Sequence, residues 1–249
     1  MSFKDHFSGQ PAAYAAFRPR YPPELYDFVA ALPDRRRLAW DCGTGSGQAA
    51  VGLARYFERV VATDASAAQI AHAQAAAGVE YRVARAEASG LREGSVDLVT
   101  VAQALHWFDI PAFLAEAARV LLPGGALAVW TYGEPALVEA ALDEPFQRYT
   151  RQLLGSYWPP ERQLVREGYR TLTLPFQEID CPQLILEYDW TLAELGGYVG
   201  TWSATRAYVA ARRNDPIPAL LRLLAPAWGA AGARRRVRWP LVLRAGRKA

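Results

Sequence analysis

Apolar and polar positions along the chain fall into blocks with two alternating periods. Short apolar runs that are typical of buried strands stand at 38–41, 59–64, 79–84, 96–102 and 126–130. Segments with the spacing of amphipathic helices stand between or after them, at 48–57, 66–75 and 111–121. A strand followed by a helix, repeated in this way, predicts a parallel sheet with right-handed crossovers. We therefore expect a doubly wound, Rossmann-like α/β fold.

The second half of the chain interrupts this rhythm and then resumes it. Residues 134–175 are aromatic, contain prolines and have a mostly helical pattern, so we expect an inserted helical lid there. Further strands are predicted at 177–190 and 236–243, with helical patterns at 192–212 and 216–228. The predicted sheet then has seven strands, most of them parallel. The chain has the length of one large domain, which we expect to span residues 1–249.

The composition points to a protein of a reducing compartment with no membrane partner. No run of about 18 apolar residues, the length needed to cross a bilayer, occurs in the sequence. The first residues, Met-Ser-Phe-Lys-Asp-His, lack the apolar core of a secretory signal. The two cysteines, Cys42 and Cys181, are typical of buried thiols in a chain that needs no disulfide. We expect a cytoplasmic location.

The basic residues favour neither a nucleic-acid partner nor lysine chemistry. The net charge is +3, and almost all of the basic residues are arginines. The densest run, 234–236 followed by Arg238, is expected at a solvated loop and strand edge, because most charge runs are solvated. Lysine stands only at Lys4 and Lys248, so no mid-chain lysine can form a Schiff base or a Tyr-Lys dehydrogenase pair.

The most informative motif is a glycine-rich loop between the first predicted strand and the following helix. It reads Asp41-Cys-Gly43-Thr-Gly45-Ser-Gly47, and Asp64 ends the next strand. The glycines allow a tight turn and a close approach of a ligand to the backbone, and an acid at the end of the second strand can accept both hydroxyls of a ribose. This arrangement predicts the nucleoside-binding half of a doubly wound fold.

The spacing of the loop indicates which nucleoside cofactor is bound. A dinucleotide fold has the pattern G-x-G-x-x-G, whereas this chain has D-x-G-x-G-x-G, and no Gly-Lys-Ser/Thr of a Walker loop follows. The acid at the entrance, Asp41, would repel a phosphate but suits the ammonium group of a methionine moiety, directly or through water. The motif therefore favours S-adenosylmethionine, and we assign no metal ligands.

Several further motifs make the sequence resemble the class I S-adenosylmethionine-dependent methyltransferases. Within them it is similar to the small-molecule branch that includes trans-aconitate and ubiquinone-pathway (type 11) methyltransferases, over roughly residues 7–130. Besides the glycine loop, the resemblance rests on Ala86-Glu87, on Gly94-Ser-Val-Asp97-Leu-Val, on Gln103-Ala-Leu-His106-Trp107-Phe108-Asp109 and on Arg119-Val-Leu-Leu-Pro123-Gly124-Gly125.

The resemblance implies a set of cofactor residues and a cap. The loop would lie against methionine and ribose, Asp64 would hold the ribose, and the Ala86-Glu87 stretch would lie beside adenine, although an aspartate is commoner there. Residues 1–35 would form a helical cap over the cofactor, in which Tyr14 and Arg18 would bind the methionine carboxylate. The residues expected at the cofactor are Asp41, Gly43, Thr44, Gly45, Gly47, Asp64, Ala65, Ala86, Glu87, Gln103, Tyr14 and Arg18. The product would be S-adenosylhomocysteine.

The acceptor is expected at the carboxyl end of the fourth strand, where ligands bind in such folds. We place Tyr21, His106, Trp107 and Trp202 there. His106 is the candidate catalytic residue, as a base or a polar clamp, but it can equally be an imidazole that is hydrogen-bonded in place without transferring a proton. Trp202 can wall the pocket or belong to the core.

The function expected is methyl transfer to a small molecule, with a carboxylate or a hydroxyl as the acceptor group. The Asn/Asp-Pro-Pro-aromatic turn and the Pro-Cys nucleophile of nucleic-acid methyltransferases are missing from the sequence. Methylation of a macromolecule and a non-catalytic S-adenosylmethionine-binding protein remain as alternatives. The sequence leaves the oligomeric state and the methylated atom open.

Overall fold

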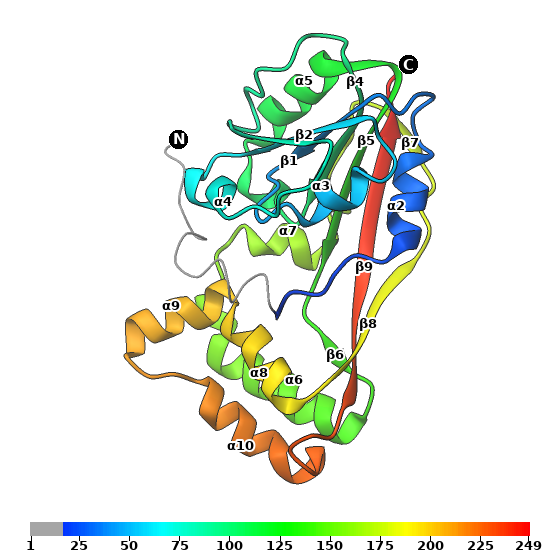
Figure 1. Ribbon diagram of the computed structural model, residues 1–249. Helices are drawn as coiled ribbons and strands as arrows, with labels where there is room; N and C mark the ends of the chain where they lie inside the picture. Colours follow the sequence, from blue (N-terminus) through cyan, green and yellow to red (C-terminus); the bar gives the residue numbers. More distant parts are fainter. Residues whose placement is uncertain (1–16) are drawn as a thin grey trace.

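The computed structural model describes residues 17–249, and its centre is one large sheet (Figure 1). The strand order is β3-β2-β1-β4-β5-β9-β6, and β7 and β8 also pair with β9. The strands are β1 (Leu38–Cys42), β2 (Arg59–Asp64), β3 (Val79–Val83), β4 (Val96–Ala102), β5 (Leu121–Tyr132), β6 (Ala136–Leu137), β7 (Gln177–Ile179), β8 (Leu184–Trp190) and β9 (Arg235–Arg247).

The α-helices lie between and after these strands. They are α2 (Pro23–Ala30), α3 (Gln48–Leu53), α4 (Ala67–Ala71), α5 (Ile110–Val120), α6 (Ala140–Leu154), α7 (Arg162–Arg166), α8 (Leu192–Gly200), α9 (Ser203–Arg212) and α10 (Ile217–Trp228). Two single turns of 3₁₀ helix are η1 (Leu105–Trp107) and η2 (Gly155–Tyr157). None of the helices in residues 17–249 is long and apolar enough to span a membrane.

The strand directions confirm the doubly wound, mostly parallel fold. The pairs β1–β2, β1–β4, β2–β3 and β4–β5 are parallel. The long strand β9 is antiparallel to β5, β6, β7 and β8, so it alone runs against the others in the described sheet. Because the strands run together, the loops that follow β1 to β5 meet at one edge of the sheet.

The sheet has nine strands where the sequence predicted seven. The strand expected at 177–190 is divided into β7 and β8, and β6 adds a strand of two residues. Pro182, which has no N–H to donate, stands in the interruption between β7 and β8. The helix expected at 192–212 is likewise divided at Thr201 and Trp202 into α8 and α9.

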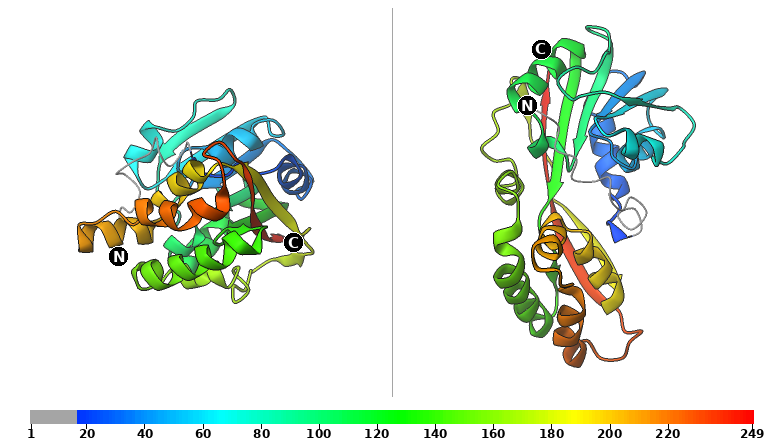
Figure 2. Two further views of the ribbon diagram at one scale, coloured as in Figure 1. Left: turned by 90° about the horizontal axis from the view of Figure 1, so that it is seen from below. Right: turned by 90° about the vertical axis from the view of Figure 1, so that its left-hand side faces the viewer.

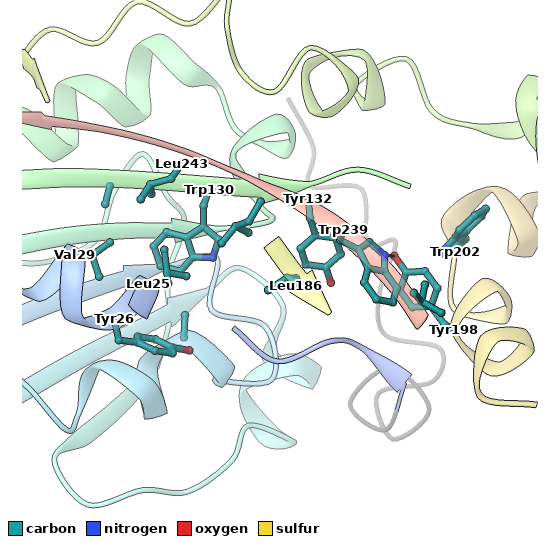
Figure 3. Packing of buried hydrophobic residues seen from close by; sticks show 14 of the residues in the cluster. Leu25, Tyr26, Val29, Trp130, Tyr132, Leu186, Tyr198, Trp202, Trp239 and Leu243 are labelled. Atoms are coloured by element: carbon teal, nitrogen blue, oxygen red, sulfur yellow. Dashed lines mark hydrogen bonds between the residues drawn. The ribbon is translucent and has the colours of Figure 1, made fainter. Parts of the chain in front are cut away.

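Both faces of the sheet are covered, as a doubly wound fold requires. On one face, α2 and α3 bury apolar side chains against β1, β2 and β5, with Leu25 and Val29 close to Trp130 (Figure 3). On the other face, α5 buries Phe113 and Ala117. Alternate residues of β1 and β4 point to opposite faces, which is why most residues of both strands are apolar.

A helical part lies beyond the sheet and is joined to it by β8 and β9 (Figures 1 and 2). In it, α6 packs against α9 and α10, and η2 packs against α6 and α9. The region expected as a lid, residues 134–175, therefore contributes α6 and η2 to a cluster that also contains the C-terminal helices. A continuous core runs into this part through Tyr132, Trp239, Tyr198 and Trp202 (Figure 3).

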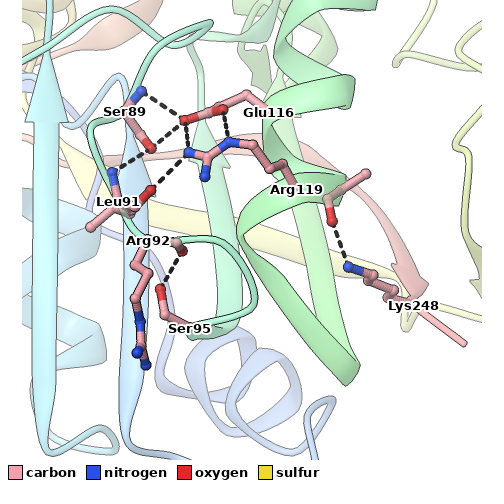
Figure 4. Close-up of polar contacts among 8 residues, drawn as sticks. Ser89, Leu91, Arg92, Ser95, Glu116, Arg119 and Lys248 are labelled. Atoms are coloured by element: carbon pink, nitrogen blue, oxygen red, sulfur yellow. Dashed lines mark hydrogen bonds and ion pairs between the residues drawn. The ribbon is translucent and has the colours of Figure 1, made fainter.

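A buried carboxylate fixes the long connection between β3 and β4 (Figure 4). Glu116 Oε1 accepts hydrogen bonds from the backbone N–H and the hydroxyl of Ser89, at 2.9 and 2.5 Å. Arg119 donates both to Glu116 and to the carbonyl of Leu91. These contacts tie the loop that carries Ala86 to α5, so the loop has a defined position at the edge of the sheet.

The arginines at the start of β9 are matched by acids on β8. Arg236 forms ion pairs with Glu187 and Asp189, and Arg238 pairs with Glu187. Cross-strand pairs of opposite charge stabilise a sheet modestly. The dense arginine run therefore begins a strand that is paired on both sides, by β8 and β6, and does not lie at the sheet edge that the sequence predicted.

Candidate functional site

A cavity of about 1050 Å³ lies at the carboxyl ends of the parallel strands. Its walls are the loops that follow β1 to β4, the last residue of β5, the segment that precedes α2, and the residue that precedes α7. Twelve of the residues proposed from the sequence line it: Arg18, Tyr21, Gly43, Thr44, Gly45, Asp64, Ala65, Ala86, Glu87, Gln103, His106 and Trp107. Asp41, Gly47 and Trp202 are not among the lining residues, and Tyr14 falls outside the part of the chain that the structure describes.

The glycine loop turns sharply because its three glycines have positive φ. At Gly47, with φ of +85°, an added Cβ would collide with the Tyr81 side chain, and at Gly43 it would collide with Ala104. At Gly45 the one atom of residues 17–249 found within 4 Å of an added Cβ is Gln69 Oε1, at 4.0 Å. Two glycines are therefore needed for packing within the protein, whereas Gly45 leaves its backbone open to the cavity.

Asp64 ends β2 and connects two loops. Its Oδ2 accepts from the N–H of Gly45 at 2.9 Å, and its Oδ1 accepts from the N–H of Ser66 at 2.9 Å. Asp64 lines the cavity, where a carboxylate suits a ligand that carries hydroxyl groups. Ser66 caps α4, as the sequence predicted, by accepting from Gln69 N–H at 3.3 Å.

Asp41, which the sequence assigned to the methionine ammonium group directly or through water, lies beneath the cavity. It has no exposed surface, and its two oxygens accept hydrogen bonds from the hydroxyls of Thr44 and Thr100, at 2.5 and 2.8 Å. Burial raises its pKa from the ordinary 3.8 to about 6. Asp41 therefore holds the glycine loop to β1 and β4 from below, and a direct contact with a ligand in the cavity is not available to it.

Glu87 joins the loops after β3 and β4. Its Oε1 accepts from the N–H of Asp109 at 3.1 Å, and its Oε2 accepts from Arg85 at 3.2 Å. Ala86, Glu87, Phe108 and Asp109 together line one side of the cavity beyond Asp64. This side combines apolar surface with carboxylates, which suits a neutral, planar group better than a phosphate.

Comparison with known proteins agrees with this geometry. The family model described as a methyltransferase domain matches residues 40–129, from β1 to β5. A candidate methyltransferase of Dictyostelium discoideum is 36% identical over 232 residues, which covers 91% of this chain and 87% of that protein. The chain belongs to the methyltransferase family. It is a class I enzyme, and its cofactor is S-adenosylmethionine.

Solved structures share the methyltransferase fold. A candidate type II methyltransferase from Anaeromyxobacter dehalogenans has 44% identity and a TM-score of 0.86, covering 93% of this chain and 98% of that one. Phosphoethanolamine N-methyltransferase 2 of Haemonchus contortus, in complex with phosphomonomethylethanolamine and S-adenosylhomocysteine, shares the fold with 19% identity. Its TM-score is 0.53, over 100% of this chain and 60% of that one.

The residues of the methyltransferase fit S-adenosylmethionine at one end of the cavity. Gly45 leaves the backbone accessible, and Asp64 carries a carboxylate that suits ribose hydroxyls. We call this the cofactor end: residues 43–49, Asp64, Ala65, 84–87 and 108–109. The opposite side, with Arg18, Tyr21, 103–107 and Tyr132, we call the acceptor end.

The acceptor end contains a buried chain of hydrogen bonds. His106 Nδ1 lies 3.1 Å from the Tyr169 hydroxyl, and that hydroxyl also has a hydrogen bond with Thr131. Thr131 Oγ1 donates to Gln103 Oε1 at 2.5 Å, and Gln103 Nε2 donates to the carbonyl of Tyr132 at 3.1 Å. Gln103 and Tyr169 both have positive φ, +57° and +54°, which marks two strained positions at the same wall.

His106 is neutral in this surrounding. Burial, with a further contribution from the charge of Arg162, lowers its pKa from the ordinary 6.5 to about 3. Gln103 Oε1 can only accept, so Thr131 donates to it, and the Tyr169 hydroxyl can donate to Thr131 in turn. In that arrangement the Tyr169 oxygen accepts from His106 Nδ1–H, and His106 Nε2 is a hydrogen-bond acceptor.

Trp202 belongs to the core, which was the second of the two placements considered for it. It is 2% exposed and packs against Phe146, Trp158 and Tyr198, with ring centroids 5.3 to 6.4 Å apart. Tyr198 in turn faces Arg18, whose guanidinium carbon lies 5.3 Å from its ring centroid. Trp202 therefore supports the acceptor end from behind.

Sequence reasoning missed several residues of this end. Tyr132, Glu161, Arg162 and Tyr169 come from β5 and from the segment around α7, far along the chain from the motifs. The one available signal was the aromatic, proline-bearing composition of residues 134–175, which predicted a helical insertion but no individual contact.

Proposed function

We propose that this methyltransferase transfers the methyl group to a small molecule that occupies the acceptor end of the cavity. The observation that carries the proposal is the cavity itself: one continuous space of about 1050 Å³ contains both the glycine loop and the His106 wall. Its size and mixed lining are those of a small-molecule site. The segment around Arg18 and Tyr21, and Glu161 before α7, close it from the side of the helices.

We propose the following roles at the cofactor end. Asp64 accepts the ribose hydroxyls, the backbone around Gly45 lies against methionine and ribose, and Ala86 with Glu87 flanks the adenine. Arg18, which belongs to the acceptor end, pairs with the methionine carboxylate where the cofactor reaches that end. Bound S-adenosylmethionine supplies an electrophilic methyl group on a positively charged sulfur. The chain aligns the acceptor with that methyl group and excludes water, which is the larger part of catalysis in such a displacement.

The acceptor end supplies orientation. His106, neutral and held by Tyr169, offers Nε2 as a hydrogen-bond acceptor to a hydroxyl or amine of the acceptor. Tyr21, which stacks edge-on against Trp130 at 5.5 Å, and Trp107 supply apolar walls. A carboxylate acceptor needs no base, and a hydroxyl acceptor would be oriented by His106. We place the enzyme in the small-molecule branch on these grounds.

Calorimetric titration with S-adenosylhomocysteine, S-adenosylmethionine and NADH tests the cofactor roles. We expect the first two to bind and NADH to show no binding. Asp64→Ala should weaken S-adenosylhomocysteine binding about 100-fold, because it removes the ribose acceptor and releases Gly45 and Ser66. The exposed acid Asp34, changed to Asn, is the control and should leave the affinity unchanged.

The acceptor class is tested by methyl transfer from labelled S-adenosylmethionine. We expect label in small carboxylic acids or hydroxylated compounds, and none in oligonucleotides or in mixed protein substrates. Label found only in a macromolecule would refute the proposal. Cofactor binding with no transfer to any class would favour the non-catalytic alternative.

A further inference from the structure

A half-buried arginine lies beside the acceptor end and has no acidic partner among the described residues. Arg162 begins α7, and its guanidinium carbon lies 4.2 Å from the ring centroid of Trp158. Arg162 forms no ion pair with a carboxylate of residues 17–249, and its buried Nε has no hydrogen-bond partner there. Buried arginines are normally paired, because an uncompensated charge costs free energy away from water.

The acids near Arg162 do not neutralise it. Glu134 forms its ion pair with Arg166 instead, at 3.4 Å. Glu161 lines the cavity one position before Arg162. Burial lowers the pKa of Arg162, and the charges of Arg18 and Arg166 act in the same direction. The stack on Trp158 compensates only part of this cost.

The position of Arg162 connects it with the acceptor end. Its charge acts on His106, on Tyr169 and on the Tyr198 hydroxyl, so all three lie near the guanidinium. Arg18 packs over the same Tyr198 ring and lines the cavity. The positive charges of Arg18 and Arg162 therefore both lie near Tyr198, and that of Arg162 also lies near His106.

We propose that Arg162 binds an oxyanionic group of the methyl acceptor, in the simplest case a carboxylate, near His106 at the acceptor end of the cavity, whose wall includes the neighbouring Glu161. The inference rests on the proposed function and names the substrate class of that site. A planar guanidinium, held flat by Trp158, matches the two oxygens of a carboxylate. The anion compensates the charge that the protein leaves unpaired, while Arg18 adds to the local positive field.

The same chemistry has a second source, the methionine carboxylate of the cofactor. Arg18 is assigned to that group above, and Arg162 then serves the acceptor. The two sources make different predictions for cofactor affinity. S-adenosylhomocysteine carries the carboxylate, whereas 5′-methylthioadenosine lacks it.

The first experiment measures thermal unfolding of the protein saturated with S-adenosylhomocysteine, with succinate, benzoate or inorganic phosphate added at constant ionic strength. Succinamide and benzamide are the neutral controls. Wild-type protein should be stabilised by at least one anion but not by its amide. Arg162→Met should lose this response, and Arg166→Met, which removes an exposed arginine of the same helix, should keep it.

The second experiment measures the affinities of S-adenosylhomocysteine and 5′-methylthioadenosine in Arg162→Met. Both should stay within about twofold of wild type. A loss of about tenfold or more for S-adenosylhomocysteine alone would assign the anion to the cofactor and overturn the acceptor assignment. Arg18→Met should show that selective loss.

Three results would overturn the proposal. They are an equal anion response in wild type and Arg162→Met, no anion response in wild type, and failure of both Arg162→Met and Arg162→Gln to fold, since the arginine would then be structural. If wild-type protein binds S-adenosylhomocysteine but is not stabilised by any of the anions, this inference alone is contradicted. Wild-type protein that does not bind S-adenosylhomocysteine contradicts the proposed function.

Discussion

The two ends of the cavity are built in different ways. The cofactor end uses backbone: Gly45 with its open surface, and Asp64, which is held by two N–H groups, come from two consecutive strand ends. The acceptor end uses side chains from distant segments, such as His106 after β4 and Tyr169 after α7. A local motif therefore defines one half of the site, and tertiary packing defines the other.

The two ends also differ in charge. Carboxylates border the cofactor end, with Asp64 and Glu87 on its wall and Asp41 beneath it. Guanidinium groups dominate the acceptor end, with Arg18 on the wall and Arg162 behind it. A cavity of opposite polarity at its two ends can orient a cofactor and an anionic acceptor relative to each other.

The largest expected effect comes from a substitution behind the acceptor end, which should lower the stability of the protein but leave cofactor binding unchanged. Trp202→Ala should lower the free energy of unfolding by about 4 kcal/mol, because it empties the space between Phe146, Trp158 and Tyr198. Urea unfolding measures this loss. At temperatures where the variant is folded, its affinity for S-adenosylhomocysteine should stay close to that of wild type. Equal loss of cofactor affinity would show that the two ends are not separable.

This difference explains how much the sequence could predict. The parallel strands β1, β2 and β4 and the glycine loop follow from local pattern, and they position Gly45 and Asp64. The burial of Asp41 could not be predicted, because it depends on Thr100 on another strand. For the same reason no sequence pattern indicates that Arg162 lies near His106, since the packing of α7 against η1 brings them together.

The second prediction concerns Asp41, which lies beneath the cofactor end. The folded pKa of Asp41, about 6, lies above its ordinary 3.8, so the folded protein holds this proton more tightly than the unfolded chain. Stability from this group is fully present below about pH 4 and is lost as the pH rises to about 6. The loss should be roughly 3 kcal/mol.

The measurement compares urea unfolding of wild type and Asp41→Asn from pH 4 to pH 7. As the pH rises, the unfolding free energy of wild type should fall relative to that of Asp41→Asn. Asp34→Asn, at an exposed position, serves as the control. A constant difference between wild type and Asp41→Asn would mean that the Thr44 and Thr100 hydroxyls fully compensate the burial.

The third prediction tests the positioning of His106 by Tyr169. Tyr169→Phe keeps the ring and removes the hydroxyl that meets His106 Nδ1 and Thr131. For a hydroxylated acceptor, kcat/KM should fall about tenfold, equivalent to about 1.4 kcal/mol. The affinity for S-adenosylhomocysteine should not change. Tyr56→Phe, which removes an exposed hydroxyl bonded to Asp27, is the matched control.

The smallest effect is expected for the titration of His106 itself. Its pKa of about 3 lies below the ordinary 6.5, so the imidazole is neutral at and above neutral pH, and its charge enters only as the pH falls toward 3. The ring signals of His106, assigned by comparison with His106→Asn, should not move in NMR spectra between pH 5 and pH 8. A midpoint near 6.5 would place the imidazole in contact with water and remove the argument for a fixed hydrogen-bond acceptor. If the His106 signals are constant in wild type but titrate in Tyr169→Phe, then Tyr169 holds the ring in its buried position. The acceptor end would then depend on contacts between side chains, whereas the cofactor end depends on the backbone.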